Sequence, residues 1–394
     1  MMQLIFNGNE VWAEDPEAMD RFIKNYIGQK RGSRVFLHPE EALYAMAFMN
    51  AGCVDAKGKP ATFTTLASAF SVHEPRLFVR YNAVRDWRDR GLIVRRLADD
   101  KMKSGGQAGL KKYPPGKIAK TTVSATLLWH NGFSTLEDET IGRELFQTYW
   151  LGQLGVYKQT RGSILALDFM ETIFAGKHLG LLIVDAATGK KLAAETILKT
   201  AEKEREYARQ LYEVYEDWRL NGYIVKTGFK FGTHFRIYFP GASPANRDDE
   251  WIHSKHVLHV FPKGQKMVIS EWARAVRVAH GVKKTFILSI PEFTKDDVAD
   301  YPADYVAYRR KSEGGNLVRE TPDDKPRYLL VPVAEDESIG GIELASLLEK
   351  AKKLGLEVLL SITDRETAIT YYVLKKIQLP GAAHEYYEIE WMKP

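Results

Sequence analysis

Residues 81–94 read YNAVRDWRDRGLIV, and residues 212–225 read YEVYEDWRLNGYIV. Both stretches contain a tyrosine, the run Asp-Trp-Arg and a glycine at the same spacing, and Trp87 and Trp218 lie 131 residues apart. A shared pattern at a constant offset is the signature of an internal repeat. Each stretch is predicted to form an amphipathic helix that leads into a β-branched strand.

The repeat extends toward the N-terminus of each stretch. Residues 36–46, FLHPEEALYAM, parallel residues 166–176, ALDFMETIFAG, so that Glu41 corresponds to Glu171. Earlier still, LIFNGNEV at 4–11 resembles LLWHNGFS at 127–134, and a helical pattern follows each of them. The sequence therefore predicts two copies of one small α/β module.

A basic segment joins the two modules. Residues 101–121, KMKSGGQAGLKKYPPGKIAKT, contain six lysines, four glycines, a Pro-Pro pair and no acidic residue. This composition is typical of a loop. A solvated linker is one interpretation, and a contact with RNA phosphates is the other, because clustered lysines attract phosphate.

The composition excludes several classes of protein. The chain has 394 residues, with 56 Lys and Arg against 51 Asp and Glu, a balance too weak to name a partner. The single cysteine, Cys53, excludes a disulfide framework and a Cys-rich metal site and fits a reducing cytosol. No apolar run approaches the roughly 20 residues of a membrane-spanning helix, and the N-terminus does not resemble a signal peptide. We expect a soluble cytoplasmic protein.

Strand-rich sequence follows the second module. Residues 226–265 alternate in polarity around an acidic stretch, a helix is expected at 270–280 with Ser270 as its N-cap, and residues 281–290 read as a buried strand. A weaker echo follows: ADYVAY at 303–308 corresponds to THFRIY at 233–238, and LEVLLSI at 356–362 corresponds to KTFILSI at 284–290. The C-terminal part is predicted to be a degenerate copy of the strand-rich domain, without a preceding helical module of its own.

Few residues could carry chemistry. The chain has no Walker loop, G-x-S-x-G, paired-Cys zinc pattern or H-E-x-x-H. His253, His256 and His259 would share a helix face, but their apolar neighbours favour a strand, which puts His256 on the opposite face from the other two and argues against a metal site. Tyr238 and Lys284 complete a cluster with His253, although each alone could be a sheet aromatic, a surface imidazole or an edge lysine.

Three stretches of sequence favour a catalytic role for these residues over a structural one: GYIVKTGFKFGTHFRIY at 222–238, HSKHVLHVFP at 253–262 and RVAHGVKK at 277–284. Together they closely resemble the catalytic domain of archaeal tRNA-splicing endonucleases, in which the corresponding blocks end in Tyr, begin with His and close with Lys. The duplicated blocks resemble the N-terminal module of the same family. The whole chain resembles three-unit fusions known among such endonucleases of small acidophilic archaea.

The resemblance implies a fold class and a domain order. We expect an α/β (α+β) protein with repeated N-terminal modules, a restriction-endonuclease-like catalytic domain with a mixed sheet flanked by helices, and a degenerate copy of that domain. The expected boundaries are an extra N-terminal module at 1–100, the linker at 101–121, a second module at 122–225, the catalytic domain at 226–293 and a structural domain at 294–394. In that last domain Tyr308 corresponds to Tyr238, but Leu356 replaces Lys284, and His253 falls near Lys325 and Pro326, so we expect it to be inactive.

The resemblance also implies a mechanism without metal or cofactor. Tyr238 would be the general base toward the 2′-hydroxyl, His253 the general acid, and Lys284 the cation on the phosphorane, giving a 2′,3′-cyclic phosphate and a 5′-hydroxyl. A phenol needs a nearby cation to act as a base, and Lys284 is the candidate. Arg277 would stack on an extruded base, and Lys255 could contact phosphate.

The family's substrate is the bulge-helix-bulge of precursor tRNA, which is cut twice. Because this chain contains one complete set of the three residues, two cuts imply a homodimer. Acidic residues would plug a basic cleft on a neighbouring unit, or would simply be solvated turns: Asp248, Asp249, Glu250, Glu320, Asp323 and Asp324. The β-rich stretches 369–377 and 385–393 are candidates for strand augmentation at interfaces. Two alternatives stay open, a catalytically silent RNA-binding or scaffolding subunit and a metal-dependent nuclease.

Overall fold

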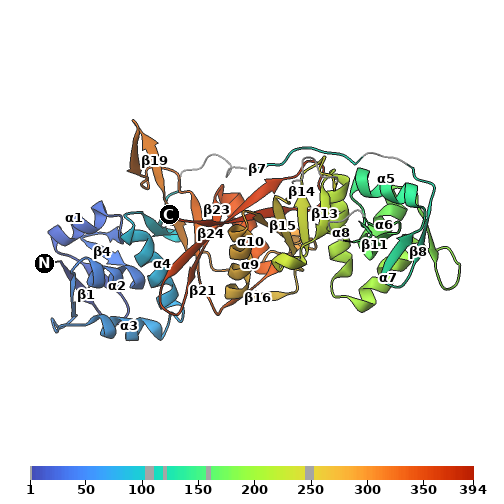
Figure 1. Ribbon diagram of the computed structural model, residues 1–394. Coiled ribbons are helices and arrows are strands. Elements are labelled where there is room, and N and C mark those ends of the chain that lie inside the picture. Colours follow the sequence, from blue (N-terminus) through green and yellow to red (C-terminus); the bar gives the residue numbers. More distant parts are fainter. Residues whose placement is uncertain (1, 103–110, 119–121, 157–160, 245–252) are drawn as a thin grey trace.

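The computed structural model describes residues 2–102, 111–118, 122–156, 161–244 and 253–394. The molecule is elongated, with the N-terminal module at one end, the second module at the other and the strand-rich units between them (Figure 1). In the part of the chain that is described, no helix is long and apolar enough to cross a membrane.

The first module is a five-stranded sheet in the order β3-β4-β2-β1-β5, covered by four helices. Its elements are β1 (Gln3–Phe6), β2 (Val11–Ala13), α1 (Pro16–Lys24), β3 (Gln29–Arg31), β4 (Arg34–Leu37), α2 (Pro39–Phe48), β5 (Gly52–Asp55), α3 (Phe63–Ser71) and α4 (Leu77–Asp89). Cys53 is buried in the core of this module, and burial raises the pKa of its thiol to about 11.

The second module repeats this topology as β10-β11-β9-β8-β12. Its elements are β8 (Thr126–Trp129), β9 (Phe133–Leu136), α5 (Glu139–Tyr149), β10 (Gln153–Leu154), β11 (Leu165–Asp168), α6 (Phe169–His178), β12 (Leu182–Asp185), α7 (Ala194–Glu204) and α8 (Ala208–Leu220). Strand for strand the connections are the same, which confirms the predicted duplication.

The glutamate that occupies the same position in both modules makes the same hydrogen bonds in each. Glu41 accepts hydrogen bonds from the backbone N–H groups of Gly28 and His38, and Glu171 accepts from those of Gly152 and Asp168. Each carboxylate therefore closes the first turn of a helix and holds the glycine turn before the neighbouring strand.

The repeated Asp-Trp-Arg fixes the last helix of each module, α4 or α8, to the large sheet. Asp217 accepts a hydrogen bond from the hydroxyl of Tyr386 at 2.7 Å, and Trp218 packs edge-on against the same ring at 5.1 Å. Asp86 and Trp87 make the equivalent contacts with Tyr371, at 2.8 Å and 5.3 Å. Asp and Trp thus join module and sheet, whereas the arginine of each copy donates to a carbonyl within its own module, Arg88 to that of Asn25 and Arg219 to that of Tyr149.

The strand-rich units share one sheet of eleven strands. Its main path is β13-β14-β15-β17-β25-β24-β23-β21-β18-β6. The strands of the catalytic half are β13 (Ile224–Thr227), β14 (Phe235–Tyr238), β15 (His256–Val260) and β17 (Thr285–Ser289). Those of the other half are β6 (Val94–Arg96), β18 (Tyr305–Ala307), β21 (Tyr328–Ala334), β23 (Glu357–Thr363), β24 (Ile369–Gln378) and β25 (Tyr386–Met392).

Strand pairing in this sheet shows which strand-rich unit the first module packs with. Strand β6, which ends that module, pairs antiparallel with β18 of the C-terminal unit, just as β13 pairs with β14 in the catalytic unit. The C-terminal unit therefore has a helical module after all, supplied by the opposite end of the chain. The sequence pattern did not indicate this, because the first module and the C-terminal unit are separated along the chain by the second module and the catalytic unit.

Two further expectations about this sheet are wrong. Residues 369–377 and 385–393 are not free edges for augmentation, because β24 and β25 lie inside the sheet and β25 joins the two halves by pairing with β17. The linker is not wholly solvated either. Strand β7 (Lys111–Lys112) pairs with the end of β24, and the following Tyr113 is only 4% exposed, in the core formed by the second module and the strands β13, β14, β15 and β17.

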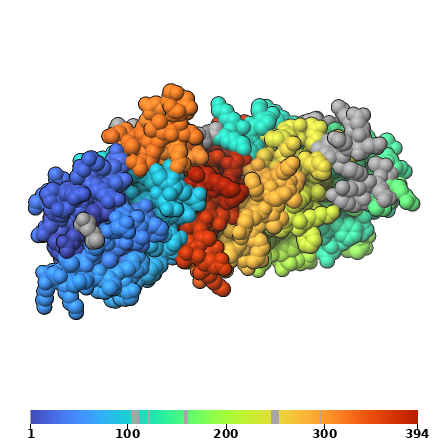
Figure 2. Space-filling model, turned by 60° about the vertical axis from the view of Figure 1, so that its left-hand side comes forward, coloured from blue at the N-terminus to red at the C-terminus, as the bar shows by residue number. Residues whose placement is uncertain are grey.

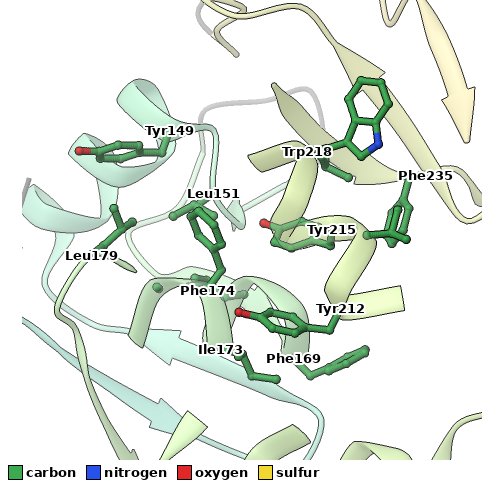
Figure 3. Close-up of a cluster of buried hydrophobic side chains, with 14 of the residues drawn as sticks. Tyr149, Leu151, Phe169, Ile173, Phe174, Leu179, Tyr212, Tyr215, Trp218 and Phe235 are labelled. Carbon is green, nitrogen blue, oxygen red and sulfur yellow. The ribbon is translucent and has the colours of Figure 1, made fainter. Parts of the chain in front are cut away.

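The second module and the catalytic sheet share one hydrophobic core. Tyr212, Tyr215 and Trp218 recur at helical spacing along α8 and pack against Phe169, Ile173 and Phe174 of α6 (Figure 3). Phe235 of β14 lies against the same cluster, opposite Tyr149 and Leu151 from the end of α5. Because of this common core, the module is a fixed wall beside the catalytic strands.

Helix α9 (Ile269–Gly281) confirms the expected helix, but Ser270 is not its N-cap. The helix begins at Ile269 after Val268, and the N–H groups of Ile269 and Ser270 donate to the carbonyls of Glu337 and Glu335. A neighbouring backbone segment thus caps the helix where a serine side chain was expected. Its C-terminal counterpart in the other half is α10 (Gly341–Leu354), and short paired strands β16 (Lys266–Val268) and β22 (Ser338–Gly340) precede the two helices.

A hairpin of β19 (Arg310–Glu313) and β20 (Asn316–Arg319) projects from the C-terminal unit, as the orange lobe of Figure 2. Its second strand carries Leu317, which is 76% exposed.

Candidate active site

A pocket of about 880 Å³ lies between the second module and the catalytic sheet. Tyr238, His253 and Lys284 all line it. So do five other basic residues, Lys226, Lys230, Arg236, Lys255 and Lys283, and the aromatic residues Phe133, Trp150 and Phe231. The three residues that the sequence singled out, although spread over 46 positions, therefore face one cavity, in whose lining basic side chains outnumber the two acidic ones, Asp168 and Glu171.

Tyr238 ends β14 and is only 4% exposed. The indole of Trp150, from the end of α5, packs on its ring with 4.8 Å between centroids. The guanidinium carbon of Arg236 lies 5.9 Å from the ring centroid. Sequence reasoning named Lys284 as the candidate cation for this tyrosine, whereas the cation that the structure places over its ring is Arg236.

Lys284 follows the left-handed residue Lys283, with a φ of 55°, in the turn between α9 and β17. Its ammonium donates to the carbonyl oxygen of Ser254 at 2.6 Å and lies 5.3 Å from the ring centroid of Phe231. Burial lowers the pKa of Lys284, and the nearby positive charges of Arg236 and Lys255 lower it further. An ammonium in such a cluster gains from an anion that enters the pocket.

His253 is exposed and opens the segment that leads into β15. The next residue, Ser254, is buried and accepts the hydrogen bond from Lys284, while the N–H of Lys255 donates to the carbonyl of Ile237. The histidine is thus flanked by backbone anchored both to the lysine turn and to the strand of Tyr238.

The C-terminal unit repeats this backbone frame with other residues at the positions of His253 and Lys284. Tyr308 follows β18 and donates its hydroxyl proton to Asp100 at 2.8 Å. Leu356, buried to 3% exposure, donates its N–H to the carbonyl five residues earlier, as Lys284 does in its own turn. Arg327 bonds to Ala307 as Lys255 bonds to Ile237, which places Lys325 at the position of His253. The register agrees with the correspondence read from the sequence.

The other two histidines of this run, His256 and His259, lie in β15 and are not among the described residues that line the pocket. His256 and His259 lie on opposite faces of β15, as the strand pattern predicted, whereas His253 precedes the strand. His256 packs on Tyr113 at 5.1 Å, and His259 packs on His234 at 4.4 Å between ring centroids. Within the described ranges, no three His, Cys, Asp or Glu side chains are grouped so that they could hold a metal ion.

Arg277 lies apart from the pocket. It is exposed on α9, near Tyr372 of β24, whose pKa is raised by burial against the opposing effect of the Arg277 charge. It does not line the cavity among the residues described. A base that stacked on Arg277 would therefore be held outside this chain's own pocket.

The acidic residues divide into two groups. Asp248, Asp249 and Glu250 lie outside the described residues. In the other half, the carboxylate of Glu320 accepts from the N–H of Arg309 at 2.7 Å, and that of Asp324 accepts from Lys311 at 2.7 Å. These two acids therefore brace the base of the β19-β20 hairpin within the chain, and Asp323 beside them is exposed.

Sequence reasoning missed the pocket residues that come from neighbouring elements. Arg236 stands two positions before Tyr238, so period-two alternation on β14 could have placed both on one face. Phe231 lies in the GFKFG stretch that was quoted for the resemblance but was given no role. Trp150 gave no comparable signal, because its contact with Tyr238 depends on how the second module docks.

Comparisons with known proteins agree with this geometry. Residues 208–299 match the family model "tRNA intron endonuclease, catalytic C-terminal domain", a span that holds Tyr238, His253 and Lys284. A tRNA-splicing endonuclease of Methanopyrus kandleri is 33% identical over 150 residues, which cover 38% of this chain and 77% of the relative. The chain belongs to the tRNA-splicing endonuclease family.

Other members of the family extend the match. A tRNA-splicing endonuclease of Pyrococcus abyssi is 30% identical over 152 residues, or 39% of this chain and 82% of the relative. One of Methanosarcina barkeri is 21% identical over 351 residues, or 76% of this chain and 98% of the relative. The family likeness thus extends well beyond the catalytic half.

Proposed function

We propose that the protein cleaves precursor tRNA at bulge-helix-bulge exon–intron junctions, by attack of the RNA's own 2′-hydroxyl and without a metal ion. The observation that carries the proposal is the convergence of Tyr238, His253 and Lys284 on one basic pocket. Three different proton-carrying or cationic groups are what a transesterification needs when the nucleophile belongs to the substrate. The products would be a 2′,3′-cyclic phosphate and a 5′-hydroxyl.

Tyr238 is proposed as the general base toward the 2′-hydroxyl. Its buried ring packs against Trp150 and lies near the guanidinium of Arg236, so the phenolic oxygen has little freedom to turn away. A cation near the ring also favours negative charge on the phenol oxygen. Arg236 is therefore proposed to support this role, together with Lys284.

Lys284 is proposed as the cation on the non-bridging phosphate oxygens. Its depressed pKa comes from burial and from like charges, and the negative charge of a phosphate bound near Lys284, Arg236 and Lys255 would offset both effects. The hydrogen bond to Ser254 keeps the ammonium in place before the substrate arrives. Preorganised charge of this kind is worth more than charge that must reorient.

His253 is proposed as the general acid for the leaving 5′-oxygen. Its exposed imidazole is free to approach the substrate, while the anchored backbone of Ser254 and Lys255 limits how far it can swing. Lys255, exposed at the pocket rim, is proposed to contact phosphate, and Arg277 to stack on an extruded base outside the pocket.

Two cuts need two active sites, so we propose a homodimer. The C-terminal unit of each chain has Lys325 and Leu356 where the catalytic unit has His253 and Lys284, which leaves one complete set per chain. A twofold dimer would match the pseudo-symmetry of two bulges. The acidic stretch at 248–250 and Asp323 are the proposed interface residues, and sedimentation of the protein alone tests the dimer.

A 2′-deoxy substitution tests the chemistry. An RNA with two three-nucleotide bulges, carrying a single 2′-deoxyribose before one scissile phosphate, should bind with unchanged affinity, be cut at the other bulge and stay intact at the modified one. Cutting at the deoxy position would refute the 2′-hydroxyl as nucleophile. Tight binding without any cutting of the all-ribose RNA would favour the silent subunit.

A further inference from the structure

The second module contributes an aromatic wall to the pocket, formed by Trp150 and Phe133. Phe133 begins β9, is 47% exposed and lies nearly parallel to the ring of His130, with 5.4 Å between centroids and an interplanar angle of 25°. A hydrogen bond of 2.9 Å between His130 Nε2 and Thr135 Oγ1 steadies that imidazole. An exposed, backed aromatic ring beside a cavity is a surface on which a planar group can stack.

The backbone of Trp150 is held in an unusual conformation. It is left-handed, with φ 45° and ψ 45°, which is costly for any residue other than glycine. Arg219 donates to the carbonyl of Tyr149 at 2.7 Å, and Lys226 donates to the carbonyl of Gly152 at 2.8 Å. A Cβ on Gly152 would lie 2.4 Å from the carbonyl oxygen of Ala166, so the turn admits only glycine there.

The same turn occurs in the first module, where Tyr26 has a φ of 55°. The left-handed turn is therefore a property of the module, and its occurrence in both halves says nothing about catalysis. What is particular to the second copy is its setting. The indole of Trp150 packs against Tyr238 and lines the pocket that holds His253 and Lys284.

We propose that Trp150 and Phe133 form a subsite for an unpaired nucleobase adjacent to the scissile phosphate. The inference rests on the proposed function and adds to it the place where the substrate's base is bound. Single-stranded bases are recognised by stacking on aromatic side chains, and bases in a continuous duplex are not available for it.

The arrangement of charge around the pocket orients the nucleotide. The aromatic wall comes from the second module, while Arg236, Lys255 and Lys284 come from the catalytic unit. Gln153 and Asp168 of the second module also line the cavity and offer polar atoms to the edge of a base. A nucleotide bound with its base toward the module thus has its phosphate toward the cations and Tyr238.

The test combines protein variants with abasic RNA. The probe is an RNA with two three-nucleotide bulges, made uncleavable by 2′-deoxyriboses at the scissile positions, in which each bulge base is removed in turn. For one position, loss of the base should weaken binding to the wild-type protein roughly 5- to 100-fold, the range expected of one base–aromatic stack. The same base loss should change binding to Trp150→Ala and Phe133→Ala proteins by less than about twofold.

Two variants control for indirect effects. Trp150→Phe keeps a ring and should keep most of the sensitivity to base loss. Phe48→Ala removes a ring of the same exposure, 48%, which stacks on Tyr44 in the first module far from the pocket, and it should behave as wild type. If Trp150→Ala fails to fold, Phe133→Ala carries the test, because that exposed ring is not needed for the core.

The outcomes separate this proposal from the function on which it rests. Suppose that, at every bulge position, base loss weakens RNA binding by the same factor in Trp150→Ala or Phe133→Ala as in the wild type. The aromatic wall then does not bind a base and only supports Tyr238. That result would overturn the subsite while leaving cleavage of the all-ribose RNA intact. Absence of cleavage of the all-ribose RNA by the wild-type protein would instead overturn the proposed function.

Discussion

Lys284 donates a hydrogen bond of 2.6 Å from its ammonium to the carbonyl oxygen of Ser254, the residue that follows His253. This bond ties the turn before β17 to the segment that carries the histidine. It also holds the ammonium near Arg236 and Lys255, whose charges add to burial in lowering the pKa of Lys284. Position and protonation of this lysine are therefore linked to the same neighbours.

The depressed pKa of Lys284 predicts an alkaline limit to cleavage. The lysine is charged below its pKa, and because that pKa lies below the ordinary 10.5, the charge is lost at a lower pH than for a solvated lysine. Cleavage under single-turnover conditions should fall as the pH rises through this value. Lys255→Met removes a like charge, so it should move the alkaline limb to higher pH while weakening RNA binding. A limb that stays in place in this variant would mean that another group sets it.

The two halves of the chain offer a matched pair of tyrosines. Tyr238→Phe should lower the cleavage rate by 10²-fold or more, since general acid–base groups typically contribute about 10²- to 10⁴-fold. Tyr308→Phe should leave the rate unchanged and cost about 1 kcal/mol of stability, because it removes the hydrogen bond to Asp100. Cleavage rates and urea unfolding of both variants check this, and equal loss of activity in the two would refute the assignment of one active half.

Buried histidines predict sensitivity to acid. Burial lowers the pKa of His234 to about 4, and burial with the neighbouring His234 lowers the pKa of His259 to about 3. Since the unfolded chain binds these protons near pH 6.5, the stability that neutral histidines provide is complete above that pH and is lost as the pH falls toward 4. Each contributes up to about 1.4 kcal/mol per pH unit.

His259→Phe tests this dependence. Urea unfolding of the variant between pH 7 and 4 should show a shallower loss of stability than the wild type, whereas His73→Ala, at an exposed position, should show the wild-type slope. An unchanged slope in His259→Phe would show that other groups control the acid limb.

The ion pair of Lys226 and Glu171, at 2.7 Å, joins the catalytic strand β13 to the second module. Both side chains are largely buried, at 12% and 9% exposure, so removing one partner leaves an uncompensated charge. Lys226→Met should destabilise the protein by roughly 3–5 kcal/mol. The double variant Lys226→Met/Glu171→Gln should recover part of that loss in urea unfolding. Additive losses would argue that the pair is not coupled.

The duplicated modules could be predicted from the sequence because their repeated residues have the same structural roles in both copies. Glu41 and Glu171 close the same turn, and the two Asp-Trp-Arg runs lie on the equivalent helix of each module. The same structural requirement therefore calls for the same residue types in both copies. The degenerate C-terminal copy was detectable for the same reason, since Tyr308 and Leu356 occupy equivalent backbone positions.

Contacts between distant segments could not be predicted in this way. The pairing of β6 with β18, the central place of β25 and the packing of Tyr113 all depend on which surfaces meet, and one sequence does not record that. The same limit applies to the pocket. Tyr238, His253 and Lys284 came from the resemblance, whereas Trp150 and Phe133 enter only because the second module docks beside β14.

The most direct test of the account is to determine the ends that the protein leaves on a bulge-helix-bulge RNA in EDTA, beside a His253→Ala variant. We predict two cuts with 2′,3′-cyclic phosphate and 5′-hydroxyl ends in the wild type, unchanged by the chelator and abolished in the variant. Cleavage that needs added divalent metal, or that leaves 3′-hydroxyl and 5′-phosphate ends, would contradict the assignment of Tyr238, His253 and Lys284.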